Sequence, residues 1–135
     1  MESSTCDSSV LVAAIAAWHP RHAVAHDRVD TGVRSLAGHV LVETYSVLTR
    51  MPTPQRLPSH IAADAITRLR ERVITLRASD YAQLMRLLAV AGVTGGAVYD
   101  AVVAFTAKRH DLSLLTMDAR AAPTYEAVGV RYELL

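Results

Sequence analysis

The chain has 135 residues, a formal net charge of +1, a 51% hydrophobic composition and one cysteine. Such a chain does not coat nucleic acid through bulk charge, and a single cysteine excludes an intramolecular disulfide. The apolar run from Val10 to Trp18 is too short to cross a bilayer. We therefore expect one domain over residues 1–135, acting in the reducing cytoplasm without membrane association.

The first half of the chain is predicted to contain mainly helices. A short strand precedes Asp7, and a helix that opens at Ser8 or Ser9 continues to Trp18, where Pro20 stops it. Further helices are expected over residues 21–30, 39–50 and 59–70, with a turn and a short strand within residues 32–38.

The second half alternates strands and helices more regularly. Strands are expected over residues 73–76, 112–117 and 128–134, and helices from Ser79 or Asp80 to Ala91, from Gly95-Gly96 to about His110, and just after Asp118. Strands that alternate with helices indicate a parallel sheet covered on both faces, so the fold class is α/β.

Asp100 stands out among the acidic residues because its helical neighbours are small or apolar. The residues three and four positions away are Gly96, Ala97, Val103 and Ala104. A lone carboxylate on such a face costs several kcal/mol unless it is paired or bound to a cation. The alternative explanation is a buried ion pair or a hydrogen bond near the start of the helix.

Asp7 and Asp118 each follow a predicted strand and precede a helix. In an α/β sheet this position lies at the carboxyl edge of the strands, where ligands bind, so both side chains should meet at one edge. Ser9 and Thr116 lie two residues from these aspartates and are candidates to support them or to position water. Helix capping is the alternative explanation for both aspartates.

Glu43 is the only acid in the mostly apolar helix expected over residues 39–50, where a contact with His39 is the alternative. Four such carboxylates together indicate a site for a hard cation, because Mg²⁺ and Mn²⁺ prefer oxygen ligands and clustered carboxylates repel one another without a cation. Such an ion can orient a water, lower its pKa and stabilise a phosphoryl transition state.

Four sequence motifs resemble, in order, those of the PIN-domain family, and most of all the VapC toxins of bacterial type II toxin–antitoxin systems. They are residues 7–13, Glu43 with its helix ending in Arg50, residues 95–101 and residues 114–121. The stretch Trp18-His19-Pro20-Arg21-His22 also resembles one common in VapC toxins. The similarity extends from Asp7 to the final strand.

This resemblance implies a three-layer α/β/α PIN-like domain around a central, mostly parallel sheet of four to five strands. It implies an endoribonuclease toxin that uses Mg²⁺ or Mn²⁺ to cleave RNA phosphodiester bonds, forms a homodimer and is neutralised by a VapB-like antitoxin. Carried over by position, Asp7, Asp100 and Asp118 are metal ligands, and Glu43 completes the catalytic acidic cluster directly or through water. Candidates for contacting the RNA backbone are Arg50, Lys108, Arg109 and Arg120.

Two interpretations other than a nuclease are compatible with the sequence. His19, His22 and His26 are spaced so that they could share a helix face and bind zinc, although no cysteine partner lies nearby. A non-catalytic PIN-like binding module is the second, with the apolar helical surface of Ile61, Ala65 and Leu69 as a docking site for a partner helix.

Overall fold

The computed structural model describes residues 3–135 and contains parallel strands between two groups of helices. The strands are Ser4–Cys6 (β1), Ser35–Ala37 (β2), Arg72–Ile74 (β3), Ser113–Thr116 (β4) and Tyr132–Leu134 (β5). Parallel pairing gives one sheet in the order β1-β4-β5 and a second sheet of β2 and β3. The expected α/β class is confirmed, although the strands are shorter than predicted.

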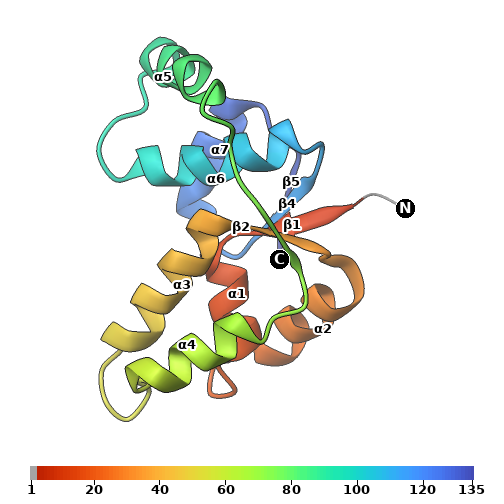
Figure 1. Ribbon diagram of the computed structural model, residues 1–135, viewed down its shortest axis with the longest axis vertical. Coiled ribbons are helices and arrows are strands. Elements are labelled where there is room, and N and C mark those ends of the chain that lie inside the picture. Colours follow the sequence, from red (N-terminus) through yellow and green to blue (C-terminus); the bar gives the residue numbers. More distant parts are fainter. Residues whose placement is uncertain (1–2) are drawn as a thin grey trace.

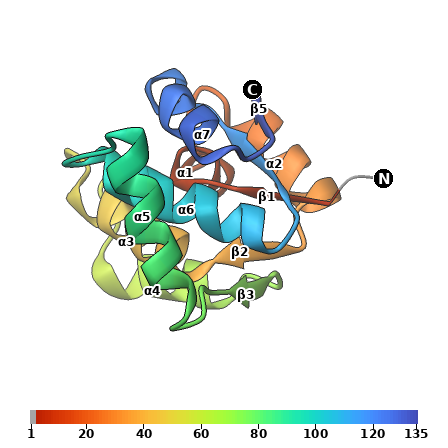
Figure 2. The same ribbon diagram turned by 90° about the horizontal axis from the view of Figure 1, so that it is seen from above.

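The two sheets meet beside β1. Ser4 forms an isolated parallel bridge with Val33, and the Thr5 hydroxyl donates to the Ser35 carbonyl oxygen at 2.7 Å. Figure 2 accordingly shows β3, β2, β1 and β5 following one another across the molecule. The carboxyl ends of these strands therefore point the same way, which brings the residues that follow β1 and β4 to one edge.

Helices cover both sides of the strands. In Figure 1, α5, α6 and α7 lie above the strands, and α1 to α4 lie below them. The helices are Ser8–Ile15 (α1), His22–Gly32 (α2), Gly38–Arg50 (α3), Ser59–Thr67 (α4), Asp80–Ala91 (α5), Ala97–Arg109 (α6) and Ala122–Val128 (α7), with a 3₁₀ turn at Ala119–Ala121. None of the helices in residues 3–135 combines the length and the apolar character needed to span a membrane.

The first helix ends earlier than predicted. We expected it to reach Trp18, but α1 ends at Ile15, and Ala16 has extended backbone angles (φ −83°, ψ 104°). In a continuous helix the ring of Pro20 would clash with the carbonyl of Ala16, four residues earlier, so the chain leaves the helix there. Trp18 is consequently placed in a turn and is 40% exposed.

The last strand begins later than predicted, at Tyr132 instead of residue 128. The reason is Gly129, which has a φ of 84° and ends α7 in the left-handed conformation that glycine adopts at least cost. Val128, which the hydropathy pattern placed in the strand, is instead the last residue of α7 and is buried.

The core is built around β1 and β4 from small and medium aliphatic side chains. Leu114 and Leu115 on β4 are at most 1% exposed, and Cys6 on β1 is fully buried and pairs with Leu115 in register. Burial, and then the negative charges of Asp7 and Glu71, raise the pKa of the Cys6 thiol well above its usual range. Asp7 thus follows a strand whose last two residues, Thr5 and Cys6, are buried.

Candidate active site

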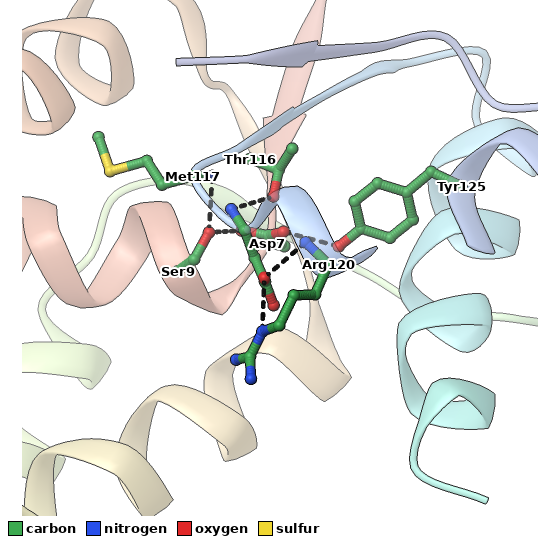
Figure 3. A network of polar contacts seen from close by, with 7 residues as sticks. Asp7, Ser9, Thr116, Met117, Arg120 and Tyr125 are labelled. Carbon is green, nitrogen blue, oxygen red and sulfur yellow. Dashed lines mark hydrogen bonds and ion pairs between the residues drawn. The ribbon is translucent and has the colours of Figure 1, made fainter. Parts of the chain in front are cut away.

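Asp7 lies at the carboxyl end of β1, where it is 5% exposed and both of its carboxylate oxygens are hydrogen-bonded. Oδ1 accepts from the Ser9 hydroxyl at 2.5 Å and from the backbone N–H of Val10 at 3.4 Å. Oδ2 accepts from the Tyr125 hydroxyl at 2.6 Å, so Ser9 and Tyr125 hold the carboxylate from two sides (Figure 3). Asp7 therefore does cap α1, and it also connects β1 to α7.

Asp118 lies on the same edge, because β1 and β4 are parallel neighbours. Its Oδ1 accepts from the backbone N–H of Arg120 at 3.0 Å, so it caps the 3₁₀ turn, and it contacts the Arg120 Nε at 3.4 Å. Asp7 and Asp118 thus lie at the same edge of the sheet, and each of them also caps the helix or turn that follows it.

Ser9 and Thr116 form hydrogen bonds that connect the residues of this edge. The Ser9 hydroxyl oxygen accepts from the backbone N–H of Met117 at 2.8 Å while it donates to Asp7 (Figure 3). The Thr116 side chain is fully buried and accepts from the backbone N–H of Asp118 at 3.0 Å. One hydroxyl therefore joins the two strand ends, and the other fixes the turn that carries Asp118.

Glu43 reaches the cluster from α3. Its side chain is 30% exposed and lies 3.5 Å from the Nε2 of His39, without an aligned hydrogen bond. Burial, followed by the charges of Asp100 and Asp7, raises the pKa of Glu43 to about 7, against a smaller opposite effect of Arg50. Burial also lowers the pKa of His39, so that residue is a weak counter-charge at neutral pH.

Asp100 is on the first turn of α6 and is partly buried. Over the described residues, 3–135, no group forms a hydrogen bond or ion pair with its carboxylate. Burial, and then the charges of Asp118 and Asp7, raise its pKa, while Arg120 acts weakly in the opposite direction. The alternative explanation, a buried ion pair or a capping bond for Asp100, is therefore wrong.

The four acids come from four separate parts of the chain. The charges of Asp100 and Asp7 raise the pKa of Glu43, and those of Asp118 and Asp7 raise the pKa of Asp100. Oxygen donors with mutually unfavourable charge fit a divalent cation chemically. In the described part of the chain, however, no three His, Cys, Asp or Glu side chains are arranged as a metal-binding group. Both carboxylate oxygens of Asp7 and the Oδ1 of Asp118 accept hydrogen bonds instead. The metal-ligand roles of Asp7, Asp100 and Asp118 therefore stay a prediction.

The four basic residues proposed to contact RNA divide into two pairs. Arg50 and Arg120 lie near the acids, and both influence their pKa values. Lys108 and Arg109 lie at the opposite end of α6 from Asp100, where they support the fold. The Lys108 ammonium donates to the Val128 carbonyl oxygen at 3.0 Å, and Arg109 forms a 3.1 Å ion pair with the buried Asp80.

The three histidines that could bind zinc by their spacing, His19, His22 and His26, lie in other surroundings. His22 and His26 do share a face of α2, with ring centroids 5.6 Å apart, but the His22 Nδ1 lies 2.8 Å from the Ala13 carbonyl oxygen. His19 lies before α2 and its Nδ1 accepts from the Arg21 backbone N–H. Residues 3–135 offer these histidines no third metal ligand.

Tyr125 is the site residue that sequence reasoning missed. It is 1% exposed, and burial, followed by the charge of Asp7 and their hydrogen bond, raises its pKa well above the usual range. The hydroxyl is therefore a permanent hydrogen-bond donor to Asp7. Its position in the short helix after Asp118, among small residues, was the one available signal.

The chain matches the family model described as "PIN domain" over residues 5–126. It is 46% identical over 130 residues to "Ribonuclease VapC40" of Mycobacterium tuberculosis strain CDC 1551, covering 96% of both chains. It is 42% identical over 124 residues to "Ribonuclease VapC27" of M. tuberculosis strain H37Rv, covering 92% of this chain and 90% of that protein.

Two solved structures have a similar fold at low sequence identity. PAE2754 from Pyrobaculum aerophilum aligns with a TM-score of 0.64 and 18% identity, over 97% of this chain and 89% of that one. FitAcB from Neisseria gonorrhoeae aligns with a TM-score of 0.64 and 16% identity, over 95% of this chain and 94% of that one.

Proposed function

The chain belongs to the PIN-domain family, within its VapC-type ribonucleases, and from that premise we propose that it is a toxin endoribonuclease that requires Mg²⁺ or Mn²⁺. The observation that supports this most directly is Asp100, a partly buried carboxylate without a protein partner, whose pKa is raised by the charges of Asp118 and Asp7. A binding module gains nothing from such a cluster, whereas a phosphodiesterase that uses a cation requires one.

In this proposal Asp7, Asp100 and Asp118 hold the cation, with Glu43 completing the cluster directly or through water. A bound divalent ion supplies the charge that activates water and neutralises the phosphate. Ser9 and Tyr125 fix the orientation of the Asp7 carboxylate through their hydrogen bonds. Glu43, with a pKa of about 7, can accept or release a proton at its carboxylate near neutral pH.

The partners of the proposed toxin are an RNA substrate, a VapB-like antitoxin and a second copy of the chain, all in the cytoplasm. A homodimer is supported by large apolar side chains exposed on α3, α5 and α6. They are Val42, Tyr45, Tyr81, Met85, Val90 and Tyr99. Light scattering of the purified chain should give twice the monomer mass, and Val90→Glu, at an 89% exposed position, should weaken the dimer without unfolding the monomer.

The decisive experiment for the nuclease is cleavage of total RNA by purified protein with Mg²⁺, with Mn²⁺ and with EDTA. Asp100→Asn and Asp7→Asn should stop cleavage, and Asp64→Asn, a change at an exposed acid paired with Arg68 on α4, should not. Cleavage that persists in EDTA or in both active-site variants would overturn the proposal. Intact RNA in every arm would favour the non-catalytic binding module.

A further inference from the structure

His39 is a polar side chain at the acidic cluster to which the proposed function gives no role. It lies on the first turn of α3, four residues before Glu43, and its Nε2 is 3.5 Å from the Glu43 Oε1. This nitrogen is shielded from solvent, and no group within residues 3–135 forms a hydrogen bond with it. A buried ring nitrogen without a partner costs free energy, so the fold alone gives no reason for a histidine at this position.

The imidazole of His39 is held by an aromatic ring. Tyr99, on the first turn of α6, stacks on it with ring planes 3° apart and centroids 5.7 Å apart. Tyr99 directly precedes Asp100, so the stack joins α3 to α6 where each helix carries an acid of the cluster. Offset stacking fixes the plane of an imidazole and leaves its nitrogens available for hydrogen bonds. The plane fixed by Tyr99 brings Nε2 close to Glu43.

The Glu43 carboxylate depends on His39 for a donor. Arg50 influences the pKa of Glu43, but its guanidinium donates to the Ser46 hydroxyl at 3.0 Å. Within the described chain, no side chain other than His39 is within ion-pair or hydrogen-bond reach of this carboxylate. A glutamate side chain has several rotamers, and a group that takes part in a cation site must be held in one of them. His39 is placed to select that rotamer.

A neutral imidazole is better suited to this task than a cationic side chain. Burial lowers the pKa of His39, so near neutral pH its ring is uncharged and carries a single N–H. An uncharged donor orients a carboxylate and leaves its negative charge available to a cation, whereas a lysine or arginine would neutralise that charge. The ring also lines a cavity of about 80 Å³ together with Tyr81 and Thr106, so it has room for the small shift that aligns the bond.

We propose that His39 is a positioning residue for Glu43, an inference that rests on the proposed function. Its Nε2–H donates to the Glu43 carboxylate and holds it toward Asp7 and Asp100. The stack on Tyr99 keeps the imidazole in the required plane. The alternative is that the contact between His39 and Glu43 only stabilises α3, as side-chain pairs four residues apart do on other helices. A helix contact affects stability alone, whereas a positioning bond also affects the affinity for the cation.

Binding of Mn²⁺ alone to the full chain tests the inference. It is measured by electron paramagnetic resonance of the free ion, at a pH above the Glu43 pKa of about 7. His39→Ala and His39→Phe should each weaken binding about tenfold, a usual effect of losing a group that orients a metal ligand. Phenylalanine keeps the stack on Tyr99, so its effect comes from the missing N–H. His39→Gln has an amide N–H and should restore most of the affinity.

Arg68→Ala is the matched control for these variants. It breaks a 3.7 Å ion pair with Asp64, also four residues apart, at the end of α4, and should leave Mn²⁺ binding unchanged. A melting temperature for each variant identifies effects that come from the fold. Wild-type Mn²⁺ affinity in His39→Ala, or binding by His39→Gln that is as weak as by His39→Ala, would overturn the inference.

The tautomer of His39 provides a second test, on the chain without a substitution. In a nuclear magnetic resonance spectrum of the Mg²⁺-loaded protein with isotopically labelled histidine, the His39 signals are those missing from the spectrum of His39→Gln. We expect a neutral ring with its proton on Nε2, since only that tautomer can donate to Glu43 through Nε2. A proton on Nδ1 and none on Nε2 would contradict the inference.

Cleavage of RNA separates this inference from the proposed function. If the wild type cleaves RNA and His39→Ala lowers kcat about tenfold with little change in KM, both stand. If the wild type and His39→Ala cleave equally well, the role of His39 is wrong and the nuclease stands. If no RNA is cleaved but Mn²⁺ binding depends on His39 as expected, the nuclease is wrong and the role of His39 at a cation site stands.

Discussion

The two acids at the strand ends and the two acids on the helices are held in opposite ways. Asp7 and Asp118 accept hydrogen bonds from the backbone and from neighbouring side chains, so each stabilises the turn in which it lies. Asp100 has no such partner in the described chain, and Glu43 has only a misaligned contact with a histidine of lowered pKa. The strand-end pair thus serves the fold as well as the chemistry, whereas the helix-borne pair contributes uncompensated charge.

The largest effect expected is on catalysis by Asp100→Asn. Removing one carboxylate from the cluster should lower kcat by on the order of a hundredfold or more, because transition-state charge stabilisation is lost. The metal-free variant should be at least as stable as the wild type, since the carboxylate has no partner to lose. The measurements are RNA cleavage rate and urea unfolding in EDTA. A clear loss of stability would show that Asp100 has a structural partner and would break the comparison.

Asp7→Asn should lose activity as well, and in addition it should lose stability. An asparagine amide group presents a donor toward Ser9 or Tyr125, so one buried hydroxyl is left unsatisfied, at a cost of about 1–3 kcal/mol in the free energy of unfolding. Urea unfolding next to Asp100→Asn tests the contrast. Equal stability of the two variants would contradict the division of the acids into two pairs.

Tyr125→Phe isolates the hydrogen bond from the acid. Loss of the 2.6 Å bond to Asp7 should lower the free energy of unfolding by roughly 1–2 kcal/mol, because the bond is buried and has a charged acceptor. Tyr132→Phe is the matched control, since its hydroxyl donates to Glu126 at 2.7 Å in an exposed position and should cost about 0.5 kcal/mol or less. Similar losses in both variants would show that burial of the Asp7 bond has no energetic consequence.

A pH dependence of stability is expected to come from Glu43. Its pKa is about 7 in the folded chain, against an ordinary 4.5, so the folded state binds the extra proton between these values. The contribution of Glu43 to stability therefore falls as the pH rises from about 4.5 to 7. Glu43 is also influenced by the neighbouring charges of Asp100, Asp7 and Arg50 and lies next to His39. The informative quantity is therefore the difference in Tm between the wild type and Glu43→Gln at each pH.

Measured in EDTA, the Tm of Glu43→Gln should decrease less than that of the wild type as the pH rises across this window. Mg²⁺ should reduce the difference, because a bound cation stabilises the ionised carboxylate. Glu133→Gln is a control in which stability depends on pH in the opposite direction. Arg28 lowers the pKa of Glu133, so this ion pair stabilises the fold at pH values above the ordinary pKa of a glutamate, and that contribution is lost as the pH falls. Parallel curves of Tm against pH for the wild type and Glu43→Gln would mean that the negative charge of Glu43 is balanced by a neighbouring positive charge, which would contradict the comparison.

The acids themselves could be predicted from the sequence, because each has a local signal. Asp7 and Asp118 follow apolar strands, and Asp100 has small or apolar neighbours at helical spacing. Their supporting contacts could not be predicted in the same way. Tyr125 lies 118 residues from Asp7 in sequence, so their hydrogen bond depends on how α7 packs against the sheet. The partnership of Arg109 with Asp80 likewise depends on how α5 and α6 meet.

Some element boundaries could be predicted from a single residue that restricts the backbone. Gly92, which ends α5 with a φ of 69°, stops the helix where the sequence indicated. The exposed position of Trp18 was not predicted, because its apolar run resembles the continuing face of a helix. Pro20 ends the helix at the residue four positions before it, Ala16, through a steric clash with the Ala16 carbonyl. The hydropathy pattern gives no sign of this clash.

Because Cys6 is buried in the central strand β1, the rate at which its thiol is modified measures how often that strand opens. A thiol that is fully buried and has a strongly raised pKa presents almost no thiolate, so alkylating reagents and peroxides cannot react with it in the native state. Modification must wait until β1 leaves the sheet, which requires the core around Leu114 and Leu115 to open. The chain has one cysteine, so each modified molecule reports one such opening. Cations that bind beside Asp7 stabilise the folded state and should therefore lower the rate of Cys6 modification.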